Sequence, residues 1–223
     1  MKKMIDFLYA LANNNNKPWF DTHKEEYKSL HKDFLAFADE LIAGIAQFDK
    51  SIEHLTAKDC TYRIYRDIRF SPDKTPYKNH AGIFICPSGK KGPHSGYYMH
   101  LEPINNLFFV CAGLFMPESK IIKSVREEIM LNGENFDKLI KNATQKGFFL
   151  DTTNNLKRVP NGYSAEDAYA EYYKLRDYLL MKSVTKDYFL DENLLSNLLK
   201  DFENTYEFSQ LLNQSVDYAL EEK

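Results

Sequence analysis

The chain has few of the residues that most often mark a function. Its 223 residues include three cysteines, nine glycines and one tryptophan. The cysteines, Cys60, Cys86 and Cys111, are odd in number and form no Cys-x-x-Cys pair, which argues against a zinc ribbon or a redox dithiol. All three lie in apolar surroundings typical of strands. We therefore expect buried free thiols in a reducing cytosol.

Long hydrophobic runs are also missing. No apolar segment approaches the roughly 20 residues that a membrane-spanning helix needs. The N-terminal segment begins with two lysines after Met1, but Asp6 interrupts it and no apolar stretch follows, so we expect no signal peptide. The sequence thus predicts a cytoplasmic protein without a membrane partner.

Charge is present but unevenly distributed. The formal net charge of −3 argues against a protein that coats nucleic acid non-specifically. Residues 58–80 nevertheless carry six Lys or Arg against three Asp, and residues 187–223 carry nine Asp or Glu against two Lys. The acidic segment has a helical pattern and is interpreted as a solvated helix face.

The hydrophobic pattern predicts a single domain over residues 1–223 with an α+β fold. We expect an antiparallel sheet from the middle third, flanked by a long N-terminal helix and by C-terminal helices. Helices are predicted at 4–12, 22–48, 118–131, 134–145, 165–178 and 191–221, the last broken near Thr205. Strands are predicted at 60–70, 81–86, 96–102, 106–115, 156–159 and 179–184.

The densest basic segment runs from residue 63 to residue 87. In a strand over 60–70, Arg66 would share a face with Ile64, Ile68 and Phe70, and an unpaired buried charge there would be costly. We expect Arg66 to pair with a carboxylate such as Glu102, or to bind an anionic ligand through its planar guanidinium. The candidate anion-binding residues are Arg63, Tyr65, Arg66, Arg69, Lys74, Tyr77, Lys78, His80 and Tyr98.

The turn after this segment contains Pro72 and Pro76 but no Gly-x-x-x-x-Gly-Lys run, so it is not a Walker loop. An extended chain would separate residues 63 and 69 by about 20 Å, at ~3.3 Å per residue. One small anion cannot contact both ends. We therefore expect Arg69, Lys74 and Lys78 to bind it, with Arg63 outside the site.

A second constellation is His100 and Glu102, which are two residues apart in a predicted strand and so face the same way. They are weak candidates for a metal site, which would need a third ligand such as His80 or His94. The sequence has no Gly-x-Ser-x-Gly nucleophile motif, and nothing in it indicates a cofactor.

Several segments resemble the signature of the bacterial "domain of unknown function 2461" family. The similar segments appear in family order and span nearly the whole chain: 14–20, 65–78, 96–103, 113–118 and 156–163. The resemblance implies one domain and no established active site. Two positions depart from the family pattern, Pro18 in place of a charged residue and Phe115 in place of an aromatic that is often tryptophan.

Three functions remain open at this point. The basic and aromatic stretch favours binding of an anionic or phosphorylated small molecule. The alternatives are a metal-assisted or acid/base hydrolase that uses His100 and Glu102, and nucleic-acid binding through the same stretch. The sequence does not identify the ligand, the oligomeric state or whether any reaction is catalysed.

Overall fold

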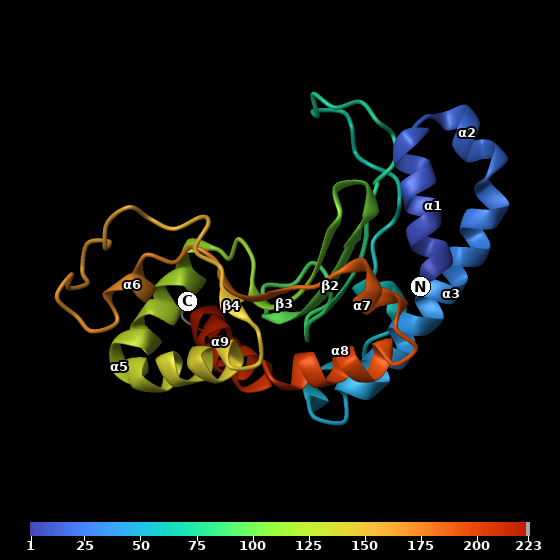
Figure 1. The fold of residues 1–223 in the computed structure, drawn as a ribbon. Helices are drawn as coiled ribbons and strands as arrows, with labels where there is room; N and C mark the ends of the chain where they lie inside the picture. The colour runs from blue at the N-terminus through green and yellow to red at the C-terminus, as the bar shows by residue number, and fades with distance from the viewer. Residues whose placement is uncertain (222–223) are drawn as a thin grey trace.

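The structure, a computed structural model, describes residues 1–221 and has the predicted α+β fold (Figure 1). Its centre is a five-stranded antiparallel sheet in the order β1-β2-β3-β5-β4. The strands are β1 Ala81–Ile85, β2 Gly96–Glu102, β3 Leu107–Leu114, β4 Phe149–Leu150 and β5 Tyr178–Ser183. Within the described residues, no helix is both long and apolar enough to cross a membrane.

Helices surround this sheet. The α-helices are α1 Lys2–Asn13, α2 Lys17–Thr22, α3 Lys24–Ile45, α4 Ala57–Cys60, α5 Ser119–Thr144, α6 Ala170–Tyr173, α7 Lys186–Leu190, α8 Leu194–Glu203 and α9 Tyr206–Glu221. Two short 3₁₀ helices, η1 Lys50–Ile52 and η2 Pro103–Asn105, lie between them. In Figure 1, α1 and α3 form one raised side of the molecule, while α5 and α6 form the other.

Three of the strands form the predicted meander. Antiparallel β1 pairs with β2, and β2 with β3, across turns rich in glycine, proline and asparagine. The next neighbour of β3 is β5, which returns after α5 and a long irregular segment. At Gly113 the backbone has φ +135°, and a Cβ there would lie 1.9 Å from the carbonyl oxygen of Tyr178, so only glycine allows β5 to approach.

One face of the sheet carries the hydrophobic core. Ile83, Met99, Val110 and Leu180 each expose 1% or less of their surface. They belong to one core cluster with residues of α1, α3, α5, α8 and α9, and α8 and α9 both contact β3. Tyr97, also on this face, donates its hydroxyl to a carboxylate oxygen of Asp49 over 2.9 Å. Burial of this apolar face against helices accounts for the layered architecture.

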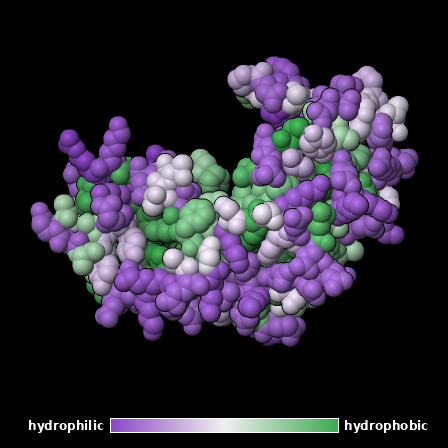
Figure 2. All heavy atoms as spheres, viewed as in Figure 1, coloured by the Kyte–Doolittle hydropathy of each residue, from purple (hydrophilic) through white to green (hydrophobic). Residues whose placement is uncertain are grey.

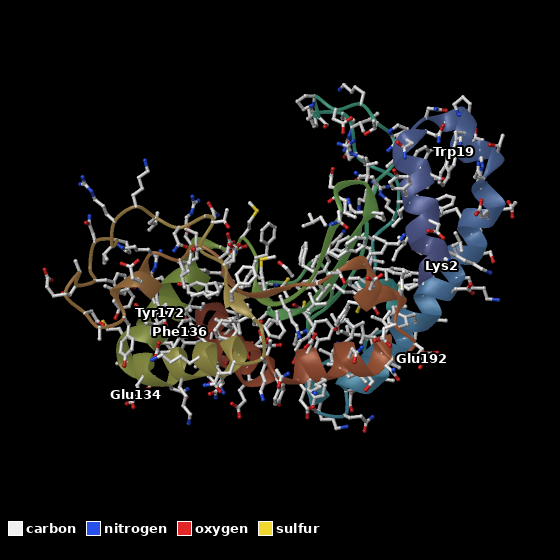
Figure 3. The ribbon with its side chains drawn as sticks, viewed as in Figure 1. Lys2, Trp19, Glu134, Phe136, Tyr172 and Glu192 are labelled. Atoms are coloured by element: carbon white, nitrogen blue, oxygen red, sulfur yellow. The ribbon has the colours of Figure 1, made fainter. Side chains whose placement is uncertain are left out.

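Most predicted helices are confirmed. The two helices predicted at 118–131 and 134–145 form one helix, α5, which has non-helical backbone angles at Asn132, where the prediction placed its break. The break near Thr205 is also confirmed, between α8 and α9. Figure 3 shows Phe136 of α5 beside Tyr172 of α6, with Trp19 on the other raised side; the Phe136 and Tyr172 ring centroids are 5.2 Å apart.

The prediction of a strand at 60–70 is wrong. This segment is irregular and forms only two isolated bridges, Thr61 with Ile83 and Tyr65 with Tyr77. It folds back on residues 71–80 as an open hairpin, in which Arg66 N donates to the Pro76 carbonyl. Proline has no N–H, so Pro72 and Pro76 cannot donate to a ladder between the two arms.

Two further predictions are wrong. Of the helix predicted at 165–178, only the short helix α6 is present. Before it, side chains form local hydrogen bonds with the backbone: Ser164 Oγ accepts from Glu166 N, and Asp167 Oδ1 accepts from Tyr169 N. Such bonds compete with helix formation. No strand forms at 156–159, and the strand of this region is β4, which pairs with β5.

Candidate functional site

Among residues 1–221, no helix layer covers the centre of the second face of the sheet, which presents the alternate residues of each strand (Figure 1). Pairing places Phe84, Tyr98, Cys111 and Met181 in one row across β1, β2, β3 and β5. A parallel row contains Gly82, His100, Phe109 and Ser183. We call this surface the open face. It combines aromatic rings with ionisable groups, unlike the apolar face beneath it.

The open face is the floor of a cleft with a volume of about 870 Å³. Figure 2 shows the molecule hollowed between its two raised sides, with apolar and weakly polar residues in the hollow and hydrophilic residues around it. Four of the six histidines line this cleft, together with four lysines. They are His31, His80, His94, His100, Lys78, Lys90, Lys91 and Lys120.

A chain of hydrogen bonds crosses the open face along β2. The Tyr98 hydroxyl lies 2.8 Å from Nδ1 of His100, and Nε2 of His100 lies 3.3 Å from Oε2 of Glu102. The other carboxylate oxygen of Glu102 accepts from Asn79 over 3.2 Å and from Asn105 over 2.6 Å. Because residues 98, 100 and 102 alternate on one strand face, the spacing itself aligns the three side chains. We call them the β2 relay.

The ionisation of the β2 relay follows from its partial burial. Burial lowers the pKa of His100, although the adjacent Glu102 carboxylate opposes this effect. Burial would raise the pKa of Glu102, but hydrogen bonds from His100 and Asn105 outweigh it and the net shift is downward. The pKa of Tyr98 is raised, chiefly by burial. Near neutral pH the relay therefore consists of a neutral phenol, a neutral imidazole and a carboxylate.

Rings enclose the imidazole of His100 on both sides. His100 stacks on Phe109 with ring centroids 4.7 Å apart, and His80 stacks on His100 at 5.2 Å. Burial lowers the pKa of His80, and the neighbouring His100 adds to that effect. The stack holds His100 in one ring orientation, and only 8% of the residue is exposed.

Lys78 is a basic residue close in sequence to His80 of this stack. Its ammonium lies over the ring of Tyr62, 5.1 Å from the centroid. Burial lowers the pKa of Lys78, and Arg63 adds to the effect. Within residues 1–221, Lys78 forms no ion pair with a carboxylate. A half-buried ammonium without a carboxylate partner is an attractive position for an anion.

The other basic residues of the hairpin have protein partners near its tip. Arg66, with 25% of its side chain exposed, pairs with Asp73 and also donates to Thr75. It therefore has the expected carboxylate partner, but that partner is Asp73 and not Glu102. Arg69 forms an ion pair with Asp67 at 2.6 Å, and Lys74 donates to the carbonyl of Ile68 over 3.0 Å.

These positions divide the predicted anion-binding residues into three groups. Lys78, His80 and Tyr98 line the cleft. Arg66, Arg69 and Lys74 belong to the tip, while Arg63 and Tyr65 are exposed and Tyr77 is buried against Phe20, with ring centroids 4.0 Å apart. Since Lys78 N bonds to the Ile64 carbonyl at the base of the hairpin, an anion site shared by Arg69, Lys74 and Lys78 stays a prediction without supporting contacts.

The described residues contain no complete set of side chains that could bind a metal ion. Among residues 1–221, no three or more His, Cys, Asp or Glu side chains lie where they could hold a metal ion together. His94, a suggested third ligand for His100 and Glu102, instead bonds Ser88 and Asp217, each at 2.9 Å. His100 and Glu102 are thus a bonded pair in the structure.

Sequence reasoning missed the cleft's aromatic and apolar floor. Phe84, Phe109, Cys111 and Met181 were not identified as site residues, although each is on the same strand face as Tyr98 or His100 once the register is known. Alternation within each predicted strand contained this signal. His31 of α3 was also missed, because a helix residue distant in sequence gives no local sign of facing the cleft.

The model of one protein family, described as "Conserved hypothetical protein (DUF2461)", matches residues 3–210. The chain belongs to this family. The resemblance seen in the sequence is thereby confirmed. No curated protein matches the chain, and no solved structure does either.

Proposed function

We propose that this DUF2461 protein binds a small organic anion in the cleft over the open face. The carrying observation is the position of Lys78, a half-buried ammonium on the cleft wall without a carboxylate partner among residues 1–221. Leaving a charge partly buried and unpaired is unfavourable, and a ligand carboxylate or phosphate would supply the missing counter-charge.

The rest of the ligand would be apolar. Beyond Lys78 and the His80–His100 stack, the floor continues with Phe84, Cys111 and Met181. A pocket with an apolar floor and few polar groups is the usual form of a small-molecule site. We therefore infer a ligand with an anionic group at one end and an aromatic or aliphatic body.

Thermal unfolding with matched probes tests the proposal. Phenylphosphonate and benzoate should raise the melting temperature, because a ligand that binds only the folded state stabilises it by mass action. Inorganic phosphate, which lacks the apolar body, should raise it less. The Lys78→Met variant should be at least as stable as the original protein without ligand, since it removes an uncompensated charge and keeps an apolar side chain.

Lys74→Met is the matched control, because Lys74 belongs to the same hairpin but bonds a backbone carbonyl at its tip. We expect the ligand-induced shift to vanish in Lys78→Met and to persist in Lys74→Met. Equal loss in both variants, or no shift with either organic anion, would refute the proposal. Stabilisation by a single-stranded oligonucleotide alone would favour the nucleic-acid alternative.

Within the cell, we infer a cytosolic location. The structure leaves Cys60, Cys86 and Cys111 as buried free thiols, and unpaired cysteines are typical of reducing compartments.

A further inference from the structure

We propose that the β2 relay makes the cleft an esterase site, in which Tyr98 removes a proton from water during hydrolysis of an anionic ester. This proposal rests on the proposed function, because Lys78 would hold the ester's negative charge. It adds a reaction that ligand binding does not require.

The proton positions in the relay follow from its hydrogen bonds. An ionised carboxylate only accepts, so Nε2 of His100 must carry the hydrogen that it shares with Glu102. Nδ1 then has a free lone pair and accepts the hydrogen of the Tyr98 hydroxyl over 2.8 Å. The phenol oxygen retains its own lone pairs and can accept a hydrogen from a molecule in the cleft. The chain therefore conducts a proton from the cleft towards His100.

The same order of groups, a hydroxyl followed by an imidazole and a carboxylate, is how enzymes activate hydroxyl groups. In this chain the carboxylate is itself fixed, because Asn79 and Asn105 both donate to Glu102. The stack of His80 and Phe109 holds the imidazole from its two faces. Fixed orientation of each donor and acceptor is what distinguishes an acid/base site from a chance hydrogen bond.

The backbone beneath Tyr98 is adapted to its hydroxyl. A Cβ on Gly82 would lie 2.5 Å from the Tyr98 oxygen and 2.6 Å from Cε2 of its ring. The ring therefore extends over β1 at a position where β1 has no side chain. The phenol oxygen thus lies over Gly82 on the cleft floor, beside His100.

The reaction balances with water as the second reactant. Water transfers one hydrogen to the Tyr98 oxygen as its own oxygen attacks the ester carbon or phosphorus, and the Tyr98 hydrogen moves to Nδ1 of His100. The imidazolium is paired with Glu102. When the bond to the leaving oxygen breaks, the proton returns through Tyr98 to that oxygen. The products are an alcohol and an acid, and the relay regains its starting state.

Roles within the relay differ. Tyr98 is the catalytic residue, because its oxygen contacts the water. His100 and Glu102 act through Tyr98 and are positioning residues. Lys78 selects an anionic substrate, whether the negative charge belongs to a carboxylate on a carboxylic ester or to a phosphodiester.

Three nitrophenyl esters test the proposal and separate these two sources of charge. Mono-4-nitrophenyl glutarate carries a free carboxylate, bis(4-nitrophenyl) phosphate is an anionic diester, and 4-nitrophenyl butyrate is neutral. We expect one anionic ester to be hydrolysed with a kcat/KM at least about tenfold above that of the neutral ester, the scale of one charge-assisted contact. Tyr98→Phe and His100→Gln should each lower it by about 100-fold or more, as expected for loss of general base catalysis.

His54→Gln is the matched control, because His54 is an exposed histidine that does not line the cleft. It should retain full activity, whereas hydrolysis by any accessible imidazole would fall in this variant too. The pH profile gives a readout that a merely structural role would not change. The groups facing His100 are Tyr98, His80 and Glu102, and kcat/KM should fall below about pH 6.5 as His100 gains a proton. It should fall again at alkaline pH, where Lys78 loses the charge that binds the anionic ester.

The outcomes are decisive in both directions. Anionic ester hydrolysis that is lost in Tyr98→Phe and kept in His54→Gln supports the relay. Activity that Tyr98→Phe retains, or no hydrolysis of either anionic ester, overturns it. Phenylphosphonate binding is measured on the same samples: binding without hydrolysis refutes the esterase alone, while absence of both refutes the binding proposal as well.

Discussion

Adjacent residues of β2 and β3 lie on opposite faces of the sheet and have opposite surroundings. Tyr97 and Phe108 face the helices and are buried. Their neighbours Tyr98 and Phe109 face the cleft and contact His100. The covered face is mainly apolar, and its polar groups pair with each other, as Tyr97 does with Asp49 and Lys182 with Asp201. The open face instead gathers imidazole, phenol and carboxylate groups.

Because of this difference, residues on one face of a strand stabilise the fold, while residues on the other face are available for binding or catalysis. Residues of the covered face contribute mainly by removing apolar surface from water. Residues of the open face bury less, and they leave polar atoms pointing at a cavity. Alternation along a strand therefore lets one sheet carry both tasks, and substitutions at neighbouring positions should affect different measurements.

The largest expected effect is the difference in the free energy of unfolding between the Phe108→Ala and Phe109→Ala variants. Phe108 exposes 3% of its surface and packs against Phe189, with ring centroids 5.9 Å apart. Its truncation should lower the free energy of unfolding by about 3–5 kcal/mol, as for other buried phenylalanines. Phe109→Ala should cost about 1 kcal/mol, the scale of one aromatic pair, and should weaken phenylphosphonate binding. Urea denaturation and ligand titration measure the two effects. Similar losses of stability in both variants would contradict the division between faces.

A smaller effect is expected for Gly82→Ala. The new methyl group would collide with the Tyr98 ring and hydroxyl, so Tyr98 must move and the bond to His100 should be lost. We expect a loss of about 1–2 kcal/mol, typical of a small-to-large change in a packed site. A double-mutant cycle with Tyr98→Ala is the control, because the penalty of Gly82→Ala should disappear when the ring is absent. A penalty that persists would locate the strain elsewhere.

The smallest expected effect is a pH dependence contributed by three histidines that line the cleft. Burial lowers the folded-state pKa values of His31, His80 and His100 below their unfolded value near 6.5. The unfolded chain therefore binds more protons below about pH 6.5, and stability should fall as the pH is lowered through that range. Above it, these groups contribute no slope. Urea midpoints at pH 7.5 and 5.5 measure the change, which should shrink in His100→Gln and remain in a variant of the exposed His54.

Much of this division was predictable from the sequence. The strands 81–86, 96–102 and 106–115 were predicted because turns rich in Gly, Pro and Ser separate them. The structure confirms them with shifts of one residue or less at each end. The common direction of His100 and Glu102 followed from their spacing. Tyr98 was predicted as a site residue, but only as a wall beside the basic stretch.

The remainder depended on contacts between distant segments. Residues 60–70 alternate like a strand, but Arg66 satisfies its charge with Asp73 and Thr75 across an open hairpin. Local spacing could not show that Lys78 would lie at the base of this hairpin while Arg69 and Lys74 lie near its tip. Nor could it show that Asn79, from the segment before β1, would join Asn105 of η2 in donating to Glu102.

The strand order has a consequence for how the chain folds. The β2 relay and its neighbours Gly82 and Phe109 lie on β1, β2 and β3, which are joined by sequence-local hairpins. Met181 and Leu179 instead lie on β5, which pairs with β3 only after α5 and the irregular segment that follows it. Closing a long loop is slower than closing a hairpin. During synthesis, β3 therefore emerges with an unpaired edge, a template for pairing with other chains. Premature termination before β5 would leave the complete relay on an aggregation-prone sheet.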